Sequence, residues 1–582
     1  MKRGIWIVGL LFGCSPQAGD ADTIPDGPSG WQPDFVCPGG PGCADADGAL
    51  RVGVAVRSIV PACFEDWDDL NDSSTWQQGS EPFRDCGCDR LCPDDDGYPG
   101  PDEGEGDGVF QAAWIAGFAN SRPATGVRGA DLGLRGEGDG LDLRVVLLDQ
   151  GSTRVAIVAM DAIGWMHDQV LRFREDVAAA GLGVDHLIVH STHSHSAPDV
   201  MGIYGPSITR TGYDPAYADQ VAASLVSAVS EAVEGLAPVQ MRWSEVDAAD
   251  YHDNGVANQI SDTRDPVVID SRIGVVRFVG EDEATVATVV HWANHPETIG
   301  GRNTLFTSDF VHALRLTVSE GSVWSDDSGQ PGVGGTTVYL NGTVGGMMTS
   351  LRANIEDPTG AVWSEASWEK VDAQGQMIGE MVLDAIGSEQ VAEAPSLRVA
   401  GHQYRMRVDN TGFRAMFFAG VFDHRTLHDF DDGAPMSDTN VPYVRTEVNL
   451  LELGPLRMIT APGEVHPEAF IGGYDGRYTP PNADLVRESN PNPPDVSQAP
   501  DGPYLRDDLG GELRWLLGLG NDELGYFIPP WNFVLANAGA YLQQAQGDHY
   551  EETNSLGPES WPTYEAEARK LLAWFNGEEV EE

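Results

Sequence analysis

Short runs of branched apolar residues alternate along the chain with stretches of helical periodicity. Residues 144–148 and 154–160 are apolar enough for buried strands, and residues 167–180 follow with a helical pattern. The next apolar run, Leu187 to Val189, predicts another strand. The order strand, strand, helix, strand predicts an α/β core with a mixed sheet.

The same alternation continues toward the C-terminus. Residues 216–233 place Val221, Leu225, Val229 and Val233 on one stripe, which predicts an amphipathic helix. Further strands are expected at 238–243, 272–279, 284–292 and near 446–460, and further helices at about 366–386 and 564–575. No internal repeat of solenoid period is seen, so we expect one folded domain over residues 46–582.

Two segments lack this periodicity. Residues 15–45 are rich in Gly, Pro, Asp and Ala, which is typical of a flexible tether. Residues 473–510, rich in Pro, Gly, Asp and Asn, are expected to form a long surface excursion.

The first residues have the pattern of an export signal. Met-Lys-Arg precedes an apolar run from Ile5 to Leu11, and Cys14 follows. Residues 1–14 resemble a bacterial lipoprotein signal, although an ordinary secretory signal is the alternative. Ser15 stands where inner-membrane lipoproteins often have aspartate, so we expect a lipid anchor in the outer membrane of a Gram-negative bacterium. No later segment has 18 consecutive apolar residues.

All seven cysteines lie before residue 93. With Cys14 set aside for lipidation, six remain in an exported chain, which predicts three disulfides of undetermined pairing. A cysteine zinc site is the weaker alternative, because Cys-Gly-Cys lacks the usual two-residue zinc spacing. The six are Cys37, Cys43, Cys63, Cys86, Cys88 and Cys92.

The charge balance limits the class of partner. Thirty-five basic against 90 acidic residues give a formal net charge of −55, which argues against binding to nucleic acid. Residues 63–108 form a Cys-rich acidic insertion. Within it, residues 94–107 space carboxylates between glycines, and this pattern is equally typical of a calcium site and of a solvated acidic loop.

Histidine, glutamate and tyrosine residues follow several of the predicted strands. His193 and His195 come directly after the strand at 187–189, on the same side of an extended chain. His295 ends the strand at 284–292, and Glu464 and Tyr526 follow Gly-containing turns. Because α/β sheets bind ligands at the carboxyl ends of their strands, we expect His193 and His195 to face a cleft, and the alternative is that they cap loops by hydrogen bonding.

Four motifs in this order resemble the neutral/alkaline ceramidase family. The family's Thr-His-Thr-His-Ser-Gly-Pro corresponds to residues 192–198, and its histidine-terminated strand with a later Ser-Asp corresponds to His295 and residues 308–309. Its Pro-Gly-Glu corresponds to residues 462–464. Its Asn-x-x-x-x-Tyr corresponds to residues 521–526, with Tyr-Glu at 550–551.

The resemblance implies an α/β, mixed-sheet catalytic core of neutral ceramidase type, without a C-terminal immunoglobulin-like domain. It implies a zinc ion held by His193, His295, Glu464 and Tyr526. His195 would then lie outside the ligand set as a catalytic residue, orienting water or passing a proton to the leaving amine. The implied activity is hydrolysis of a linear amide in a lipid or N-acyl amine, with N-acylsphingosine giving sphingosine and fatty acid.

One family position departs from the pattern. Met348 stands where the family has a serine that matters for catalysis, and methionine neither donates a hydrogen bond nor acts as a nucleophile. The alternative is that Thr343, Thr349 or Ser350 substitutes for this serine. We expect slow, zinc-dependent hydrolysis that Met348→Ser accelerates. The alternative function is a non-catalytic or weakly active metal-binding lipoprotein of the cell surface with the same fold.

Overall fold

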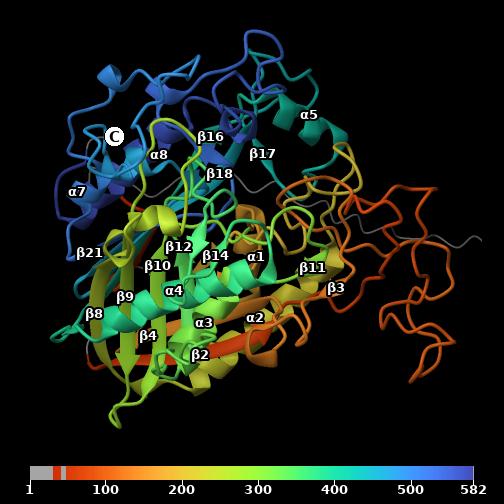
Figure 1. The fold of residues 1–582 in the computed structure, drawn as a ribbon. Coiled ribbons are helices and arrows are strands. Elements are labelled where there is room, and N and C mark those ends of the chain that lie inside the picture. Colours follow the sequence, from red (N-terminus) through yellow and green to blue (C-terminus); the bar gives the residue numbers. More distant parts are fainter. Residues whose placement is uncertain (1–30, 41–47, 152, 581–582) are drawn as a thin grey trace, which may run out of the picture.

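The computed structural model describes residues 31–40, 48–151 and 153–580, and it contains three mixed β-sheets with helices on their outer faces (Figure 1). The expected signal at residues 1–14, with Cys14, lies outside the described residues. The expected tether at 15–45 is described only for residues 31–40. Within that part, Phe35–Cys37 forms strand β1, so the folded body begins before residue 46.

The first sheet has the strand order β6-β5-β4-β2-β7. Only the β5–β6 pair is parallel, and helix α1 (His167–Ala179) connects these two strands. Helix α2 (Pro215–Glu234) follows β6. The strands are β2 (Leu50–Ser58), β4 (Asp142–Gln150), β5 (Thr153–Met160), β6 (His186–Ser191) and β7 (Ala237–Pro238).

The second sheet has the order β12-β10-β9-β8-β15. Its parallel pair is β10–β12, connected through helix α3 (Phe310–Glu320), and helix α4 (Trp368–Ile386) follows β12. The strands are β8 (Gln240–Asp247), β9 (Arg272–Val279), β10 (Thr285–Trp292), β12 (Thr336–Asn341) and β15 (Gln390–Val391).

The third sheet has the order β1-β16-β18-β19-β21, with β17 (Leu427–His428) also paired to β18. Its parallel pair is β19–β21, and helix α8 (Ser560–Phe575) lies against β16 and β18. The main strands are β16 (Leu397–Arg407), β18 (Tyr443–Leu453), β19 (Leu456–Thr460) and β21 (Leu513–Leu517).

The three sheets therefore share one topology. In each, three antiparallel strands follow one another, the chain crosses over to an outer parallel strand, a helix follows, and a short edge strand pairs with the first strand. The third sheet takes its edge strand, β1, from the N-terminal region. No internal sequence repeat corresponds to this repeat of topology.

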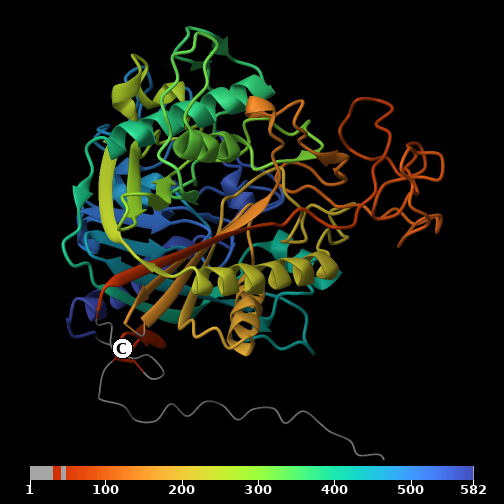
Figure 2. The same ribbon diagram turned by 90° about the horizontal axis from the view of Figure 1, so that it is seen from below.

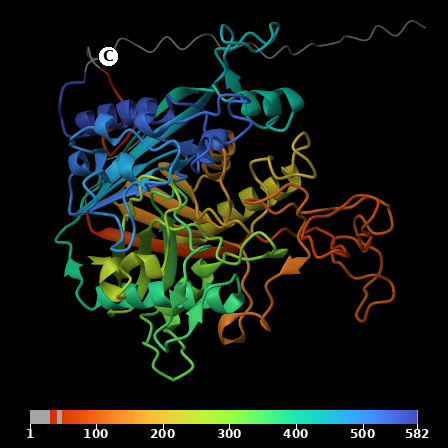
Figure 3. The same cartoon turned by 45° about the horizontal axis from the view of Figure 1, so that its top comes forward.

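One central hydrophobic core joins the three sheets. It contains Val146 and Ile157 from the first sheet, Val276 from the second, and Leu451 and Trp515 from the third. The outer faces are covered by α1 and α2, by α3 and α4, and by α8, each over its own sheet. Figure 3 shows the blue elements of the third sheet on the side of the molecule opposite α4.

The predicted helices and most predicted strands are confirmed. The helix expected at 167–180 is α1, the one at 216–233 is α2, and the strand expected at 284–292 is β10. The 473–510 excursion ends in helix α7 (Leu505–Leu509), whose two terminal leucines are buried. The remaining short elements are β3 (Gly126–Val127), β11 (Leu305–Phe306), β13 (Ile355–Glu356), β14 (Val362–Trp363), α5 (Thr411–Ala419), β20 (Glu464–Val465), α6 (Pro467–Ile471) and β22 (Tyr526–Phe527).

The Cys-rich insertion projects from the body as a lobe of loops (Figure 2). Disulfides Cys63–Cys88 and Cys86–Cys92 cross-link it, and Cys37 is disulfide-bonded as well. Of the helices in the described ranges, none combines the length and apolar character needed to cross a bilayer.

Candidate metal centre

The loops that leave the carboxyl ends of the strands meet at one place. His193 and His195 follow β6, His295 follows β10, Glu464 follows β19, and Tyr526 follows β21. Asn341, the last residue of β12, joins the loops after β6 and β10, because its side-chain amide donates to the carbonyl oxygens of Thr192 and Asn294. All five residues predicted from the sequence therefore converge.

Backbone carbonyls fix the orientation of two of these histidines. The Nδ1 atom of His193 lies 2.6 Å from the carbonyl oxygen of Ile163, and that of His295 lies 3.0 Å from the carbonyl oxygen of Met348. A hydrogen bond from Nδ1–H leaves the Nε2 lone pair of each ring free for a metal. His193 adopts a φ of 69°, which is uncommon for a non-glycine residue and typical of functional sites.

Both free nitrogens face the same carboxylate oxygen. Oε2 of Glu464 lies 3.0 Å from Nε2 of His295 and 3.4 Å from Nε2 of His193. In a tetrahedral zinc site, two ligand atoms that each lie 2.0–2.1 Å from the zinc ion are about 3.3 Å from each other. Burial opposes ionisation of Glu464, but His193 and His295 outweigh it and lower the pKa of Glu464 to about 2. The donor set and its spacing therefore fit a divalent metal.

His195 belongs to the same cluster. One ring nitrogen from each of His193, His195 and His295 lies within 4.8 Å of the others, so the three histidines alone could hold a metal ion. Nδ1 of His195 also lies 3.2 Å from Oε2 of the buried Glu297. Burial, together with the two neighbouring histidines, lowers the pKa of His195 well below its usual value, which favours the neutral ring that coordinates metals.

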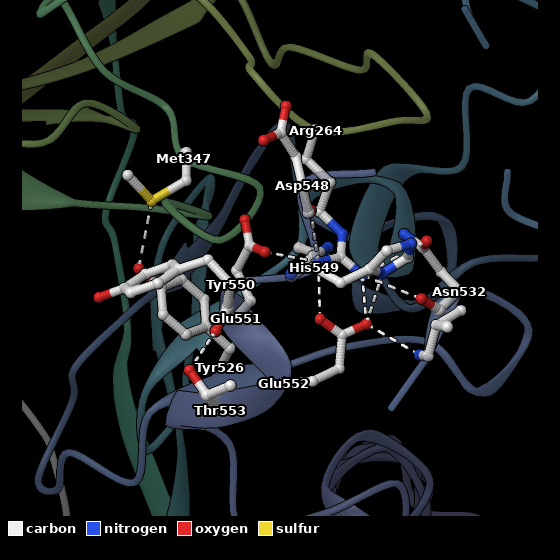
Figure 4. A network of polar contacts seen from close by, with 12 residues as sticks. Arg264, Met347, Tyr526, Asn532, Asp548, His549, Tyr550, Glu551, Glu552 and Thr553 are labelled. Atoms are coloured by element: carbon white, nitrogen blue, oxygen red, sulfur yellow. Dashed lines mark hydrogen bonds and ion pairs between the residues drawn. The ribbon is translucent and has the colours of Figure 1, made fainter. Parts of the chain in front are cut away.

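Tyr526 completes the site from the third sheet. Strands β20 and β22 are paired in parallel with Tyr526 directly beside Glu464. Burial and the Glu464 carboxylate raise the pKa of the Tyr526 phenol well above its usual value. Its hydroxyl lies 3.5 Å from the sulfur of Met347 (Figure 4). A divalent cation would oppose this shift, because it favours the phenolate form.

A buried charge network supports the chain next to Tyr526. The Arg264 guanidinium donates to Oε2 of Glu551 at 2.5 Å and to Oε1 of Glu552 at 2.7 Å, and all three side chains are almost fully buried (Figure 4). Tyr550, one residue before Glu551, packs edge-on against the Tyr526 ring at a centroid distance of 6.0 Å. Arg264 thereby fixes the segment that carries the family's Tyr-Glu motif.

Met348 does not lie beside Tyr526. Its side chain is fully buried in the hydrophobic core between the second sheet and helices α3 and α4, next to residues such as Trp292. Only its backbone carbonyl reaches the site, through His295. Met347, with a φ of 60°, is the methionine that touches Tyr526. Of the two methionine positions, 347 is the one whose side chain reaches Tyr526, and the hydroxyl of Thr349 hydrogen-bonds Glu297 beside His195.

A small, largely apolar cavity of about 60 Å³ opens onto the site. His193, Glu464 and Tyr526 form part of its wall, and helix α5 and the following turn contribute Phe413, Phe417 and Phe422. A mainly apolar wall with a few convergent polar groups is typical of a site for an apolar ligand.

Three further polar residues at the site were not singled out from the sequence. Glu297 faces His195, and Arg122 donates to the carbonyl oxygen of His195 from a buried position that lowers its pKa to about 10. Glu523 lines the cavity. Glu297 and Glu523 stand close to motif residues in the sequence, but only the folded chain shows that they face the site.

The calcium interpretation of residues 94–107 gains no geometric support. Among the described residues, the only other metal-sized group joins Asp95 to Cys86 and Cys92, whose sulfurs are bonded to each other. Other carboxylates of the insertion accept hydrogen bonds from backbone amides, as Asp102 does from Asp89.

Comparison with known proteins identifies the fold. The sequence matches no protein-family model and no curated protein. The structure is similar to that of neutral ceramidase from Pseudomonas aeruginosa, with a TM-score of 0.54, 12% identity, and coverage of 92% of this chain and 76% of that chain. A ceramidase complexed with C2 gives a TM-score of 0.53, 12% identity, and coverage of 92% and 77%. The chain therefore has the mixed α/β fold of the neutral ceramidases.

Proposed function

We propose that this chain is a zinc-dependent hydrolase of linear amides that acts on ceramide or a related N-acylated lipid amine. The single observation that carries the proposal is the position of Glu464 Oε2, 3.0 and 3.4 Å from two histidine nitrogens whose other nitrogens face backbone carbonyls. The fold of the neutral ceramidases supports the same reaction class.

Each residue has a role in this proposal. His193, His295, Glu464 and Tyr526 would hold the metal, which supplies a Lewis acid for the amide carbonyl and lowers the pKa of water. His195, which faces Glu297, would take a proton from the attacking water and pass it to the leaving amine. Because the pKa of His195 is lowered well below its usual value, its ring is neutral before the reaction and takes up this proton during it.

The cavity supports an apolar substrate. Its wall brings the three aromatic rings from α5 and the turn after it together with the candidate ligands, so apolar side chains lie next to the proposed reaction centre. Exclusion of water from such a cavity strengthens the electrostatic effect of the site.

A metal-binding surface protein without turnover is the second candidate. It is favoured by the methionine pair at 347 and 348, because no hydroxyl replaces the family's serine at either position. The lipid anchor at Cys14 and the outer-membrane location belong to both candidates and rest on the sequence pattern of residues 1–14.

The experiment is to purify the chain without its first 14 residues, measure its metal content, and assay it against ceramide and a panel of N-acyl amines. We expect one zinc per chain and slow hydrolysis that stops with a chelator and returns with zinc. Bound zinc without chelator-sensitive hydrolysis of any substrate would favour the binding protein.

A further inference from the structure

Helix α5, at the rim of the molecule, turns an uncharged face to solvent (Figure 1). Its exposed residues are spaced i, i+4, i+7 and i+8, which places them on one stripe of the helix: Thr411, Ala415, Phe418 and Ala419. Phe418 is 90% exposed, the highest value among the large apolar residues that the structure describes. Leu542, which is 68% exposed, lies beside the first turn, since a Cβ atom at Gly412 would be 3.4 Å from its Cδ2. We call this stripe, together with Leu542, the apolar tip.

The opposite face of α5 belongs to the candidate site. Phe413 and Phe417 line the cavity and pack against Phe422, with ring centroids 5.9 and 4.9 Å apart. Arg414, the only charged residue of the helix, is buried and donates to the carbonyl oxygen of Val408. The helix is therefore apolar inside and outside. A helix of this kind is normally covered on all sides, so the apolar tip is a surface that awaits an apolar partner.

Hydrogen bonds fix α5 to the segment beside Tyr526. The side-chain oxygen of Asn410 caps the helix by accepting from two backbone N–H groups of its first turn. The amide nitrogen of Asn410 donates to the carbonyl oxygens of Thr553 and Ser555. These residues follow Tyr550, whose ring packs edge-on against Tyr526. The apolar tip therefore holds a fixed position relative to the candidate metal ligands.

The small area of the apolar tip argues against a second copy of the chain as its partner. The nine residues of α5 span about 14 Å at 1.5 Å per residue. A strip of this length and about 10 Å wide covers roughly 140 Å², whereas each partner of a standard protein interface buries about 800 Å². A lipid surface needs no such area, because single aromatic and aliphatic side chains insert into it.

The charge of the chain selects the kind of lipid surface. The formal net charge is −55, and the fully exposed Asp438 lies 3.9 Å from Arg414 of α5. An anionic bilayer would repel this surface, whereas a zwitterionic bilayer has no net charge to oppose insertion.

Resting on the proposed function, we propose that the apolar tip inserts into the surface of a zwitterionic bilayer. Phe418 and Leu542 enter the region between headgroups and acyl chains, where amphipathic surface helices place their apolar faces. Phe413 and Phe417, on the other face of the same helix, then bring the cavity next to the lipids from which a substrate is drawn.

The test measures binding to vesicles by co-sedimentation. The chain without residues 1–14 is used, since an acyl group on Cys14 would itself bind vesicles. We expect binding to phosphatidylcholine vesicles, weaker binding to phosphatidylglycerol vesicles, and a loss of at least about tenfold in Phe418→Asp. Leu542→Asp should bind less well than the wild type. Leu70→Asp, at an equally exposed leucine of the Cys-rich insertion, is the matched control and should bind like the wild type.

Two results would overturn the proposal. One is absence of vesicle binding by the wild type, and the other is an equal loss in Leu70→Asp. Analytical ultracentrifugation addresses the second copy: a monomer supports the proposal, whereas a dimer that Phe418→Asp dissociates would make the apolar tip a self-interface. Because vesicle binding requires no turnover, it decides the proposal even if the chain hydrolyses no amide.

Kinetics then separate docking from catalysis. Phe418→Asp should keep kcat/KM for a soluble N-hexanoyl amine and lose at least about tenfold on ceramide embedded in phosphatidylcholine vesicles. An equal loss on both substrates would contradict docking, because it would place Phe418 in the substrate site itself. Unchanged zinc content in the variant is expected, since Phe418 lies on the face of α5 turned away from the ligands.

Discussion

The first and second sheets share their strand order, but the loops that leave their outer parallel strands differ in chemistry. After β6 come His193 and His195, whereas after β12 come Met347 and Met348. Both loops contain a residue with positive φ, 69° at His193 and 60° at Met347. Similar strand arrangements therefore deliver two loops to one site, and the side chains decide which loop contributes candidate metal ligands.

The largest expected effect comes from removing a ligand that follows β6 or β10. We expect His193→Ala and His295→Ala to lose bound zinc and more than about a thousandfold in kcat/KM, since even outer partners of metal ligands contribute ten- to hundredfold. Metal analysis and the amide assay measure both effects. His252→Ala, at an imidazole that pairs with Glu356 outside the cluster, is the matched control and should keep zinc and activity. Retention of zinc in both site variants would contradict the ligand assignment.

The next largest effect concerns Glu551 and Glu552, which follow β21 in the chain and pair with Arg264. Arg264→Met leaves Glu551 and Glu552 buried without their cation, which should lower the free energy of unfolding by about 3–5 kcal/mol. Urea denaturation measures this change. A loss below about 1 kcal/mol would mean that the network does not hold the segment.

The same network predicts a pH dependence. Burial opposes ionisation of Glu552, but Arg264 and His549 outweigh it and lower its pKa from 4.5 to about 2. Because the folded pKa lies below the unfolded one, this stabilisation is present above pH 4.5 and disappears as the pH falls from 4.5 to 2. In Arg264→Met, the unfolding free energy should fall less steeply across this window, and an identical pH profile would contradict the assignment.

Met348→Ser tests whether the side chain at position 348 lies in the hydrophobic core or at the metal site. The sequence predicts faster hydrolysis in Met348→Ser, but the buried position of the side chain now leads us to expect loss of stability instead. Removing a fully buried methionine side chain should cost about 2–4 kcal/mol of unfolding free energy, measured by urea denaturation. A rise in turnover without loss of stability would show that position 348 faces the site.

Met347→Ser changes the methionine that contacts Tyr526, and it gives the smallest expected effect. It places a hydroxyl beside Tyr526, where it can donate to a developing oxyanion, so we expect ceramide turnover to rise by about tenfold. The unfolding free energy should change by less than about 1 kcal/mol, because Met347 is only partly buried. No increase in turnover would show that the serine function cannot be restored from this position.

Local sequence patterns predicted the strands and helices that have an apolar run or an apolar stripe of their own. Strands such as β5 and β10 are continuous apolar runs, and helix α2 carries a clear apolar stripe, so each could be located from its own residues. Strand β1 was missed because it pairs with β16, more than 360 positions later in the chain. The shared topology of the three sheets was also missed, since it depends on strand pairing rather than on repeated residues.

At the candidate site, too, some residues could be predicted from local motifs and others depend on the folded chain. The motif residues His193, His295, Glu464 and Tyr526 could be identified individually, and the fold brings them together. The roles of the two methionines could not be separated, because neighbouring residues in a tight turn point in different directions. Glu523 was missed because its place in the cavity wall is a property of the folded chain, and no sequence pattern encodes it.

The order in which the candidate ligands occur along the chain bears on biosynthesis. The first, His193, and the last, Tyr526, are 333 positions apart, and the ligands between them come from the second and third sheets. A nascent chain therefore has no complete coordination sphere until nearly all of it has been synthesised and the three sheets have docked. Metal uptake would then be a late event in maturation, and a chain shortened before residue 526 would lack one of its four ligands.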